Sequence, residues 1–315
     1  MIIAGTGFFV PEKILTNLEL NKKLELEENW IYSRTGIKER RIVSIEEKTS
    51  DLAIKAAKEA LKKSEILPEE IDLIICCTIT PDKLCPSTAC KIQNEIGAKN
   101  ATSFDLNSAC SGFIFGLCTA YQYIQSGFYS NILVVGADIL SKYTNYKDKT
   151  TCILFGDGAG AFLLKKSNSN MFLDFYLKTF AEFSDVIKIP ATGTEVSNLP
   201  PFLTLDGKEV FKWAVNSVSN IILDMLEKNN LKTEDIDYFL LHQANQRINN
   251  AIATKLGLNK NKFLSNIESY GNTSAASIPI LFSENINNGT IKKGQKLLLA
   301  GFGAGLSIGA SIINF

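Results

Sequence analysis

Residues 106–117 read LNSACSGFIFGL, and this stretch decides the fold because residues 271–282, GNTSAASIPILF, have the same hydrophobic pattern. The two stretches are 165 residues apart, since 271 − 106 = 165. The same offset places NILVVGAD (131–138) over KLLLAGFG (296–303). Agreement at one short stretch arises easily by chance, so a second stretch at an unchanged offset indicates an internal repeat.

A third pair extends the repeat to the ends of two expected strands. KKSEILPEEIDLIICC (62–77) lies over EKNNLKTEDIDYFLLH (227–242), again 165 residues apart. Three stretches that share one offset predict two similar halves, 1–170 and 171–315, packed face to face.

Helical and strand patterns alternate along the chain. We predict helices over about 51–63 (capped by Ser50), 86–97 and 111–125, and strands over 71–80, 131–138 and 161–166. The helix over 111–125 is apolar nearly all round, which indicates burial. Long helices between buried strands predict α/β layering. Residues 184–206, rich in Pro, Thr, Ser and Gly, are interpreted as an irregular connection.

Composition excludes several classes of protein. Lys+Arg and Asp+Glu are both 33, and a net charge of zero argues against a nucleic-acid binder, which needs a basic surface. No apolar run is long enough to predict a membrane span, and MIIAGTGFF reads as a strand rather than a signal peptide. The seven cysteines, an odd number without a secretion signal, predict reduced thiols in a cytoplasmic protein. The single histidine and the absence of a C-x2-C pair argue against a zinc site.

The repeat gives equivalent positions different chemistry. Asn272 precedes a predicted helix, and Cys110 opens the equivalent helix, where the second half has Ala275. His242 ends a predicted strand whose counterpart ends at Cys77. We therefore expect the thiol from one half to meet the imidazole and amide from the other. A helix N-terminus favours a thiolate, and about 2 kcal/mol from it would lower the pKa of Cys110 from about 8.5 to about 7.

Two glycine-rich segments, FGDGAGA (155–161) and GFGAGLSIGA (301–310), are interpreted as tight turns. The first fits G-x-G-x-x-A, but it leads into a predicted strand, whereas a dinucleotide loop opens a helix. A backbone N–H of the second turn is a candidate oxyanion donor.

Eight motifs occur in order: WIYSRTGIKERR (30–41), PSTAC (86–90), NSACSGF (107–113), FGDGAGA (155–161), DGKEVFKWAV (206–215), LHQANQRI (241–248), YGNTSAAS (270–277) and LAGFGAG (299–305). Together they resemble the β-ketoacyl-acyl carrier protein synthase III family, whose members start type II fatty acid synthesis. The resemblance implies a thiolase-like fold of five αβαβα layers with two pseudo-symmetric halves, usually in a homodimer.

The resemblance also implies a mechanism that needs no metal or organic cofactor. Cys110 takes the acyl group from a short acyl-CoA, with backbone N–H groups of Cys110 and Ala304 as oxyanion donors. His242 and Asn272 then stabilise the enolate that malonyl-acyl carrier protein forms on losing CO2. Phe302 crowds the malonyl carboxylate.

Binding residues are implied in the same way. Trp30 and Arg34 match a pair that sandwiches the CoA adenine, Gly207 and Asn245 match the pantetheine channel, and Lys212 and Arg247 match carrier-protein docking sites. Cys85 stands where many relatives carry an aromatic residue of the acyl pocket, which predicts longer or branched primers. Ile308 also replaces a common aromatic residue.

Other functions are weighed against the same residues. Chain-elongating synthases need two catalytic histidines, and thiolases need a second cysteine in the C-terminal half, which this chain lacks. Two alternatives stay open: a related acyltransferase of secondary metabolism, and a non-catalytic acyl-CoA or carrier-protein scaffold.

Overall fold

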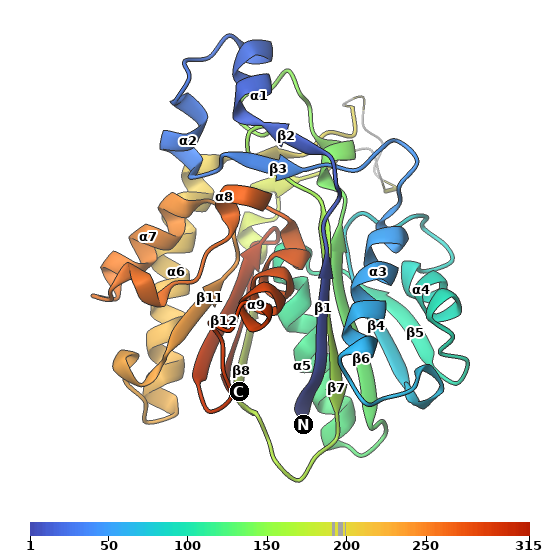
Figure 1. The fold of residues 1–315 in the computed structure, drawn as a ribbon. Helices are drawn as coiled ribbons and strands as arrows, with labels where there is room; N and C mark the ends of the chain where they lie inside the picture. The colour runs from blue at the N-terminus through green and yellow to red at the C-terminus, as the bar shows by residue number, and fades with distance from the viewer. Residues whose placement is uncertain (191–192, 195–197, 199) are drawn as a thin grey trace.

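The computed structural model describes residues 1–190, 193–194, 198 and 200–315, and its elements are labelled in Figure 1. The strands are β1 (Ile2–Phe9), β2 (Ile14–Thr16), β3 (Glu39–Arg41), β4 (Leu73–Cys77), β5 (Thr102–Leu106), β6 (Asn131–Asp138), β7 (Gly158–Lys165), β8 (Phe172–Thr179), β9 (Ile187–Lys188), β10 (Thr204–Leu205), β11 (Tyr238–Leu241), β12 (Lys296–Gly303) and β13 (Ser307–Asn314). The α-helices are α1 (Asn17–Leu24), α2 (Trp30–Thr35), α3 (Thr49–Lys62), α4 (Thr88–Ile96), α5 (Gly112–Gln125), α6 (Gly207–Lys228), α7 (Gln246–Lys255), α8 (Ile267–Tyr270) and α9 (Ser277–Asn287). Two short 3-10 turns, η2 (Ala109–Ser111) and η7 (Ser274–Ala276), precede α5 and α9.

The two large sheets share one strand order. The first runs β1-β7-β6-β4-β5, and the second, read from β8, runs β8-β13-β12-β11. In both, the pair β4–β6 or β11–β12 is parallel and the next two pairings are antiparallel. This match confirms the two pseudo-symmetric halves predicted from the repeat.

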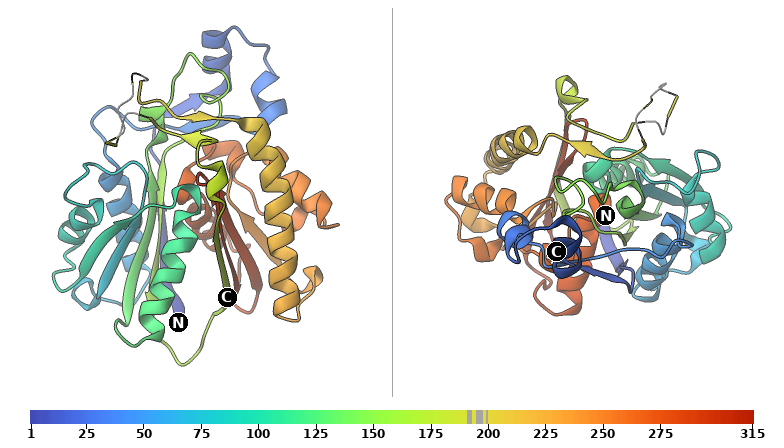
Figure 2. Two further views of the ribbon diagram at one scale, coloured as in Figure 1. Left: turned by 180° about the vertical axis from the view of Figure 1, so that it is seen from behind. Right: turned by 90° about the horizontal axis from the view of Figure 1, so that it is seen from above.

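Helices cover these sheets in five layers. α3 and α4 pack on the outer face of the first sheet, and α6 and α7 pack outside the second. Between the sheets lie α5 and α9, each in contact with strands of both (Figures 1 and 2). The predicted αβαβα fold is therefore confirmed.

The central helix α5 is buried because its residues are apolar on almost every side. Phe113, Ile114 and Leu117 belong to a core that also contains residues of both sheets. Each such side chain contributes about 1.5–3 kcal/mol by leaving water. Gly116 lets the helix approach β4, because a Cβ there would lie 2.5 Å from Cys77 Sγ.

Most observed boundaries lie within three residues of the predicted ones: α4 begins at Thr88 rather than residue 86, and β7 begins at Gly158 rather than residue 161. The predicted cap at Ser50 is wrong: α3 begins at Thr49, and Ser50 instead hydrogen-bonds Asp82 through its backbone N–H (3.0 Å) and its hydroxyl (2.6 Å). β4 stops at Cys77 rather than residue 80, because Thr78 and Thr80 turn to bind a buried carboxylate.

The offset of 165 residues does not hold for every pair of equivalent strands, because the connecting loops of the two halves differ in length. β13 begins 149 residues after β7 (307 against 158), because residues 139–157 link β6 to β7 while residues 304–306 link β12 to β13. β7 begins at Gly158, inside the first glycine-rich segment, so the segment leads into a strand rather than a helix and the rejection of a dinucleotide loop there is confirmed.

The structure covers only part of the irregular connection predicted over residues 184–206. Of residues 184–206, the structure describes the short pair β9–β10, whereas 191–192, 195–197 and 199 lie outside the described residues. The division at residue 170 falls between β7 and β8 and stays a prediction. None of the helices in the described ranges is long and apolar enough to cross a bilayer.

Candidate active site

Two sharp turns bring the starts of α5 and α9 together. Ala109, just before Cys110, has a φ of 46°, and its repeat equivalent Ser274 has a φ of 52°. Asn107 and Asn272 support these turns alike, each accepting a backbone N–H through Oδ1, from Ala109 (3.3 Å) and Ser274 (2.9 Å). Two non-glycine residues in the left-handed region at equivalent places indicate a strained geometry that the two halves share rather than an accident of one loop.

The neighbours of the two helix starts differ. Gly303, at the end of β12, lets the strand pack directly against Cys110, because a Cβ there would lie 2.6 Å from Cys110 Cβ. The equivalent residue at the end of β6 is Asp138, whose carboxylate accepts the backbone N–H of Ala275 at 3.3 Å. Cys110 lines a cavity, whereas at the equivalent place in the other half the Asp138 carboxylate binds the backbone.

His242 follows β11 and is 1% exposed. Burial lowers its pKa to about 3, so the ring is neutral at physiological pH. Its Nδ1 lies 2.7 Å from the Ser277 hydroxyl, which also accepts the Gln243 backbone N–H at 3.5 Å. We assign the Ser277 O–H as the donor to Nδ1, because no other acceptor for that proton lies within hydrogen-bond range among the described residues, and this places the ring proton on Nε2. The ring of Phe302 meets the imidazole edge to face at 5.3 Å.

Cys110, His242 and Asn272 line one narrow cavity of about 120 Å³, which we call the catalytic cavity. Four more predicted residues share its wall: Gly207, Asn245, Phe302 and Ala304. The remaining lining is mostly apolar, from Ile79, Leu140, Leu154, Phe155, Leu203, Leu205, Val210, Phe211, Trp213 and Ile248 among others. The structure thus brings seven predicted site residues together from both halves.

The electrostatics of Cys110 differ from the sequence expectation. Burial raises the pKa of its thiol to about 11, so the predicted fall towards 7 is wrong. The Ser274 hydroxyl and the backbone N–H groups of Cys110 and Ala304 face the sulfur and oppose this rise, while Asp138 adds to it. Two of these groups are the backbone donors predicted to form an oxyanion hole.

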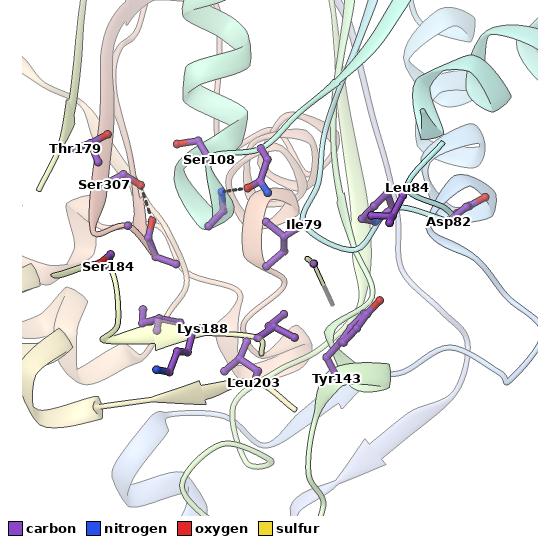
Figure 3. Close-up of a pocket in the computed structure, with 18 of the residues that line it drawn as sticks. Ile79, Asp82, Leu84, Ser108, Tyr143, Thr179, Ser184, Lys188, Leu203 and Ser307 are labelled. Atoms are coloured by element: carbon purple, nitrogen blue, oxygen red, sulfur yellow. Dashed lines mark hydrogen bonds between the residues drawn. The ribbon is translucent and has the colours of Figure 1, made fainter. Parts of the chain in front are cut away.

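A second cavity of about 840 Å³, which we call the side chamber (Figure 3), adjoins the catalytic cavity through shared lining residues. The two share Ile79, Ala109, Ile187, Leu203 and Ala304. Leu84 lines the side chamber, but Cys85 is exposed and lines neither cavity. The structure of one chain therefore does not place Cys85 in an acyl pocket.

The remaining predicted residues lie outside the catalytic cavity. Arg34 lies directly over the Trp30 ring, with its Cζ 4.2 Å from the ring centroid, which leaves no room for a base between them. Lys149 also approaches this ring, at 5.8 Å. Helix α2, which carries Trp30, is held to the cavity wall because Asn245 Nδ2 donates to the Arg34 carbonyl at 3.1 Å.

Lys212 and Arg247 are exposed beside residues that line the cavity. Lys212 lies between Phe211 and Trp213, and the Arg247 guanidinium is 5.9 Å from the Phe211 ring. Both cations therefore stand near the same wall of the cavity.

Comparison with known proteins gives one result. Models described as 3-oxoacyl-[acyl-carrier-protein] synthase III match residues 104–180 and, for its C-terminal part, 226–315. A β-ketoacyl-[acyl-carrier-protein] synthase III of Clostridium acetobutylicum is 46% identical, over 99% of this chain and 98% of the relative. This chain belongs to the β-ketoacyl-acyl carrier protein synthase III family.

Solved structures of synthase III proteins have the same fold. The protein from Aquifex aeolicus is 42% identical, with a TM-score of 0.94 over 99% of both chains. The one from Thermus thermophilus is 37% identical, with a TM-score of 0.95 over 100% of this chain and 99% of the other.

Sequence reasoning did not single out four polar residues that contact residues of this site: Asp138, Lys149, Ser274 and Ser277. The repeat offered a signal for two of them, since Ser274 and Ser277 are equivalent to Ala109 and Gly112, where the first half has no hydroxyl. Within the described residues, no group of three or more His, Cys, Asp or Glu side chains could hold a metal ion.

Proposed function

We propose that the chain condenses a short acyl-CoA primer with malonyl-acyl carrier protein, with loss of CO2, through an acyl intermediate on Cys110. As a member of the synthase III family it is a condensing acyltransferase. The observation that carries the proposal is that Cys110, His242 and Asn272 line one narrow, mostly apolar cavity.

In the first half-reaction the Cys110 sulfur attacks the thioester carbon, and the CoA sulfur leaves with a proton. The negative charge that develops on the carbonyl oxygen needs donors fixed in advance. The backbone N–H groups of Cys110 and Ala304 are supported in this role because both face the sulfur. Removing one such donor typically costs about 10²–10³ in rate.

In the second half-reaction malonyl-acyl carrier protein loses CO2, and its thioester oxygen becomes an enolate oxygen. His242 donates from Nε2, which is supported by the contact of Nδ1 with Ser277 at 2.7 Å. Asn272 donates from Nδ2, since its Oδ1 already accepts the Ser274 N–H. Both donors are neutral, and Phe302 keeps the apolar wall beside them. The enolate carbon then attacks the acyl group on Cys110.

Substrate binding follows the cavity outward. Gly207 and Asn245 line the channel for the pantetheine arm. Trp30, Arg34 and Lys149 bind the nucleotide end of CoA. The adenine base stacks on the Trp30 indole either after Arg34 has moved away from it or on the face of the indole opposite Arg34. Lys212 and Arg247 receive the acidic carrier protein at the exposed rim. The side chamber adjoins the catalytic cavity and offers space for the far end of the primer acyl chain.

We further propose a homodimer. β5 is an edge strand of the first sheet, and an edge strand offers unpaired backbone groups to a second chain. The adjoining loop exposes Leu84 (88%) and Cys85. A role for Cys85 in the acyl pocket requires this loop to reach the side chamber of a second copy. Seven free thiols favour the cytoplasm, and the mechanism uses no metal or organic cofactor.

Mass spectrometry after incubation with acetyl-CoA tests the proposal. The expected result is one acyl adduct on the peptide that contains Cys110, absent in Cys110→Ser, and turnover when malonyl-acyl carrier protein is added. A panel of straight and branched acyl-CoAs then ranks the primers. Binding of acetyl-CoA without an adduct would instead identify a scaffold.

A further inference from the structure

Two buried serine hydroxyls meet where the two halves of the chain pack together. Ser111 follows Cys110 in η2 and is 0% exposed, and Ser307 begins β13 and is 2% exposed. Their Oγ atoms lie 2.8 Å apart, which is hydrogen-bond distance for two hydroxyls. The bond joins residues 196 positions apart in the sequence, and we call this pair the serine clamp.

On one side the serine clamp holds the turn that presents Cys110. The Ser111 hydroxyl lies 2.7 Å from the Ser108 carbonyl, so it spans the backbone from residue 108 to residue 111. Between these two residues Ala109 has a φ of 46°, and such a conformation persists only where neighbouring contacts hold it. The backbone N–H of Cys110, one proposed oxyanion donor, comes directly after this strained residue.

On the other side the serine clamp holds the turn that presents Ala304. Ser307 lies opposite Gly303 in the ladder between β12 and β13, so only residues 304–306 connect the two strands. The Ser307 hydroxyl lies 2.9 Å from the Ala304 carbonyl (Figure 3). Ala304 is thus fixed through Gly303 on one side and through its own carbonyl on the other. These contacts restrict the direction of its N–H, the second proposed oxyanion donor.

Two protons serve the three contacts of the serine clamp. Each hydroxyl has one proton and can accept further hydrogen bonds. One proton lies between the two oxygens, and the other goes to the carbonyl of Ser108 or of Ala304. The Ser108 hydroxyl, 3.1 Å from Ser111 Oγ, can donate to it in both arrangements. The bond between Ser111 and Ser307 is therefore kept in either case.

The second half of the chain makes the same turn without these hydroxyls. The repeat equivalent of Ser111 is Ala276, 165 residues later. The equivalent of Ser307 is Gly158, which begins β7 and pairs with the last residue of the preceding strand, as Ser307 does in β13. η7 nevertheless holds Ser274 at a φ of 52°. The turn itself does not require a serine at either position, and the half that has both serines is the half that carries the thiol.

We propose that Ser111 and Ser307 are positioning residues that fix the two backbone N–H donors of the oxyanion hole relative to each other. The donors come from different halves, and both must point at one oxygen to stabilise its charge. Neither serine lines the catalytic cavity, so each acts through the backbone it bonds. Ser307 also lines the side chamber, which the test must separate. The inference rests on the proposed function, because the oxyanion hole is part of it.

The test compares two reactions of Cys110. Acylation by acetyl-CoA places a negative charge on the thioester oxygen and uses the oxyanion hole. Alkylation by iodoacetamide forms an S–C bond as the C–I bond breaks, and no carbonyl oxygen becomes an oxyanion. Both are followed by mass spectrometry of the Cys110 peptide, because Cys85 and Cys90 are exposed and also react.

The variants are Ser111→Ala, Ser307→Ala and the double variant. We expect the acylation rate at saturating acetyl-CoA to fall about 10- to 100-fold in each single variant, because a small misplacement near the reacting atoms has an effect of this size. Alkylation should stay within about twofold of wild type. Each substitution breaks the same bond, so the double variant should lose less than the product of the two single losses.

Two further variants complete the comparison. Ser307→Thr keeps the hydroxyl on a strand and should acylate at close to the wild-type rate. Ser311→Ala is the matched control, because it removes another fully buried serine hydroxyl of β13, which bonds the Asp174 carbonyl at 3.0 Å. It should leave both rates unchanged.

Three results would overturn the proposal. Acylation near the wild-type rate in both single variants would show that the donors do not need the serine clamp. Equal losses of acylation and alkylation would mean that it places the sulfur instead. A loss confined to the KM for acetyl-CoA would mean that Ser307 acts through the side chamber.

Melting temperatures identify a variant that does not fold, and the other single variant then decides. Wild type without an acyl adduct on Cys110 would refute the proposed function and this inference with it. Normal acylation of wild type and of both single variants would refute the inference alone.

Discussion

His242 is the single histidine of the chain, and burial lowers its pKa from 6.5 to about 3. In the unfolded chain the same imidazole takes up a proton near its ordinary pKa of about 6.5. Between these two values the unfolded state binds more protons, so the free energy of unfolding must fall as the pH falls.

This gives a prediction for stability. Wild type should lose thermal stability from pH 6.5 towards pH 4 more steeply than His242→Gln, in melts followed by circular dichroism. Asp157 acts in the opposite sense, because burial raises its pKa to about 6, but both proteins share it. Equal slopes for the two proteins would show that the folded imidazole takes up a proton in this range.

A second residue prediction concerns the tautomer of His242. Ser277→Ala removes the donor to Nδ1, so part of the imidazole population should lose its Nε2 proton. We expect decarboxylation of malonyl-acyl carrier protein to slow about 10-fold or more, while acylation of Cys110 is unchanged. The two half-reactions are measured separately by CO2 release and adduct mass. An equal loss in both would indicate general disruption instead.

At the scale of elements, the end of β12 packs directly against the nucleophile Cys110. A methyl group at Gly303 would lie 2.6 Å from Cys110 Cβ and 3.0 Å from its Sγ. Overpacking of this kind costs about 1–3 kcal/mol and displaces one of the two elements. Gly303→Ala should therefore lower the acylation rate at least 100-fold with a modest loss in melting temperature. An acylation rate near wild type would show that β12 yields without moving Cys110.

Periodicity and the repeat could predict the central elements because buried strands and helices carry their pattern locally. β6 and α5 lie where the patterns place them. The end of β4 could not be predicted, because Thr78 and Thr80 leave the strand to reach Asp138, 60 and 58 residues away in sequence. Ser50 likewise binds Asp82 rather than capping its helix.

For the whole molecule, the exposed cations near the cavity predict how the carrier protein docks. Arg247→Glu should raise the KM for malonyl-acyl carrier protein about tenfold at low salt, and leave the KM for acyl-CoA unchanged. Added salt should raise the wild-type KM for malonyl-acyl carrier protein and so reduce the difference in KM between wild type and Arg247→Glu. Lys255→Glu, at the other end of α7, is the matched control. Equal effects of both variants would contradict a docking role for Arg247.

The candidate site could be predicted in its members but not in its electrostatics. Cys110, His242 and Asn272 share a cavity because the repeat places them at equivalent element ends. The pKa of Cys110 depends on how completely both halves bury it, and no local pattern contains that information. Cys85 is exposed in a single chain, so whether it lines an acyl pocket depends on the contacts of its loop with a second copy.

Gly303 and Asp138 are the same position in the two halves, one without a side chain and one with an acid. The duplicated architecture thus has two helix starts related by a pseudo-twofold rotation, and at the second of them Asp138 accepts the backbone N–H of Ala275. We therefore expect one acetyl group per chain at saturation, measured with radiolabelled acetyl-CoA. The two halves therefore share an architecture but differ in chemistry, because only the first helix start carries a thiol, at Cys110, where the second carries Ala275.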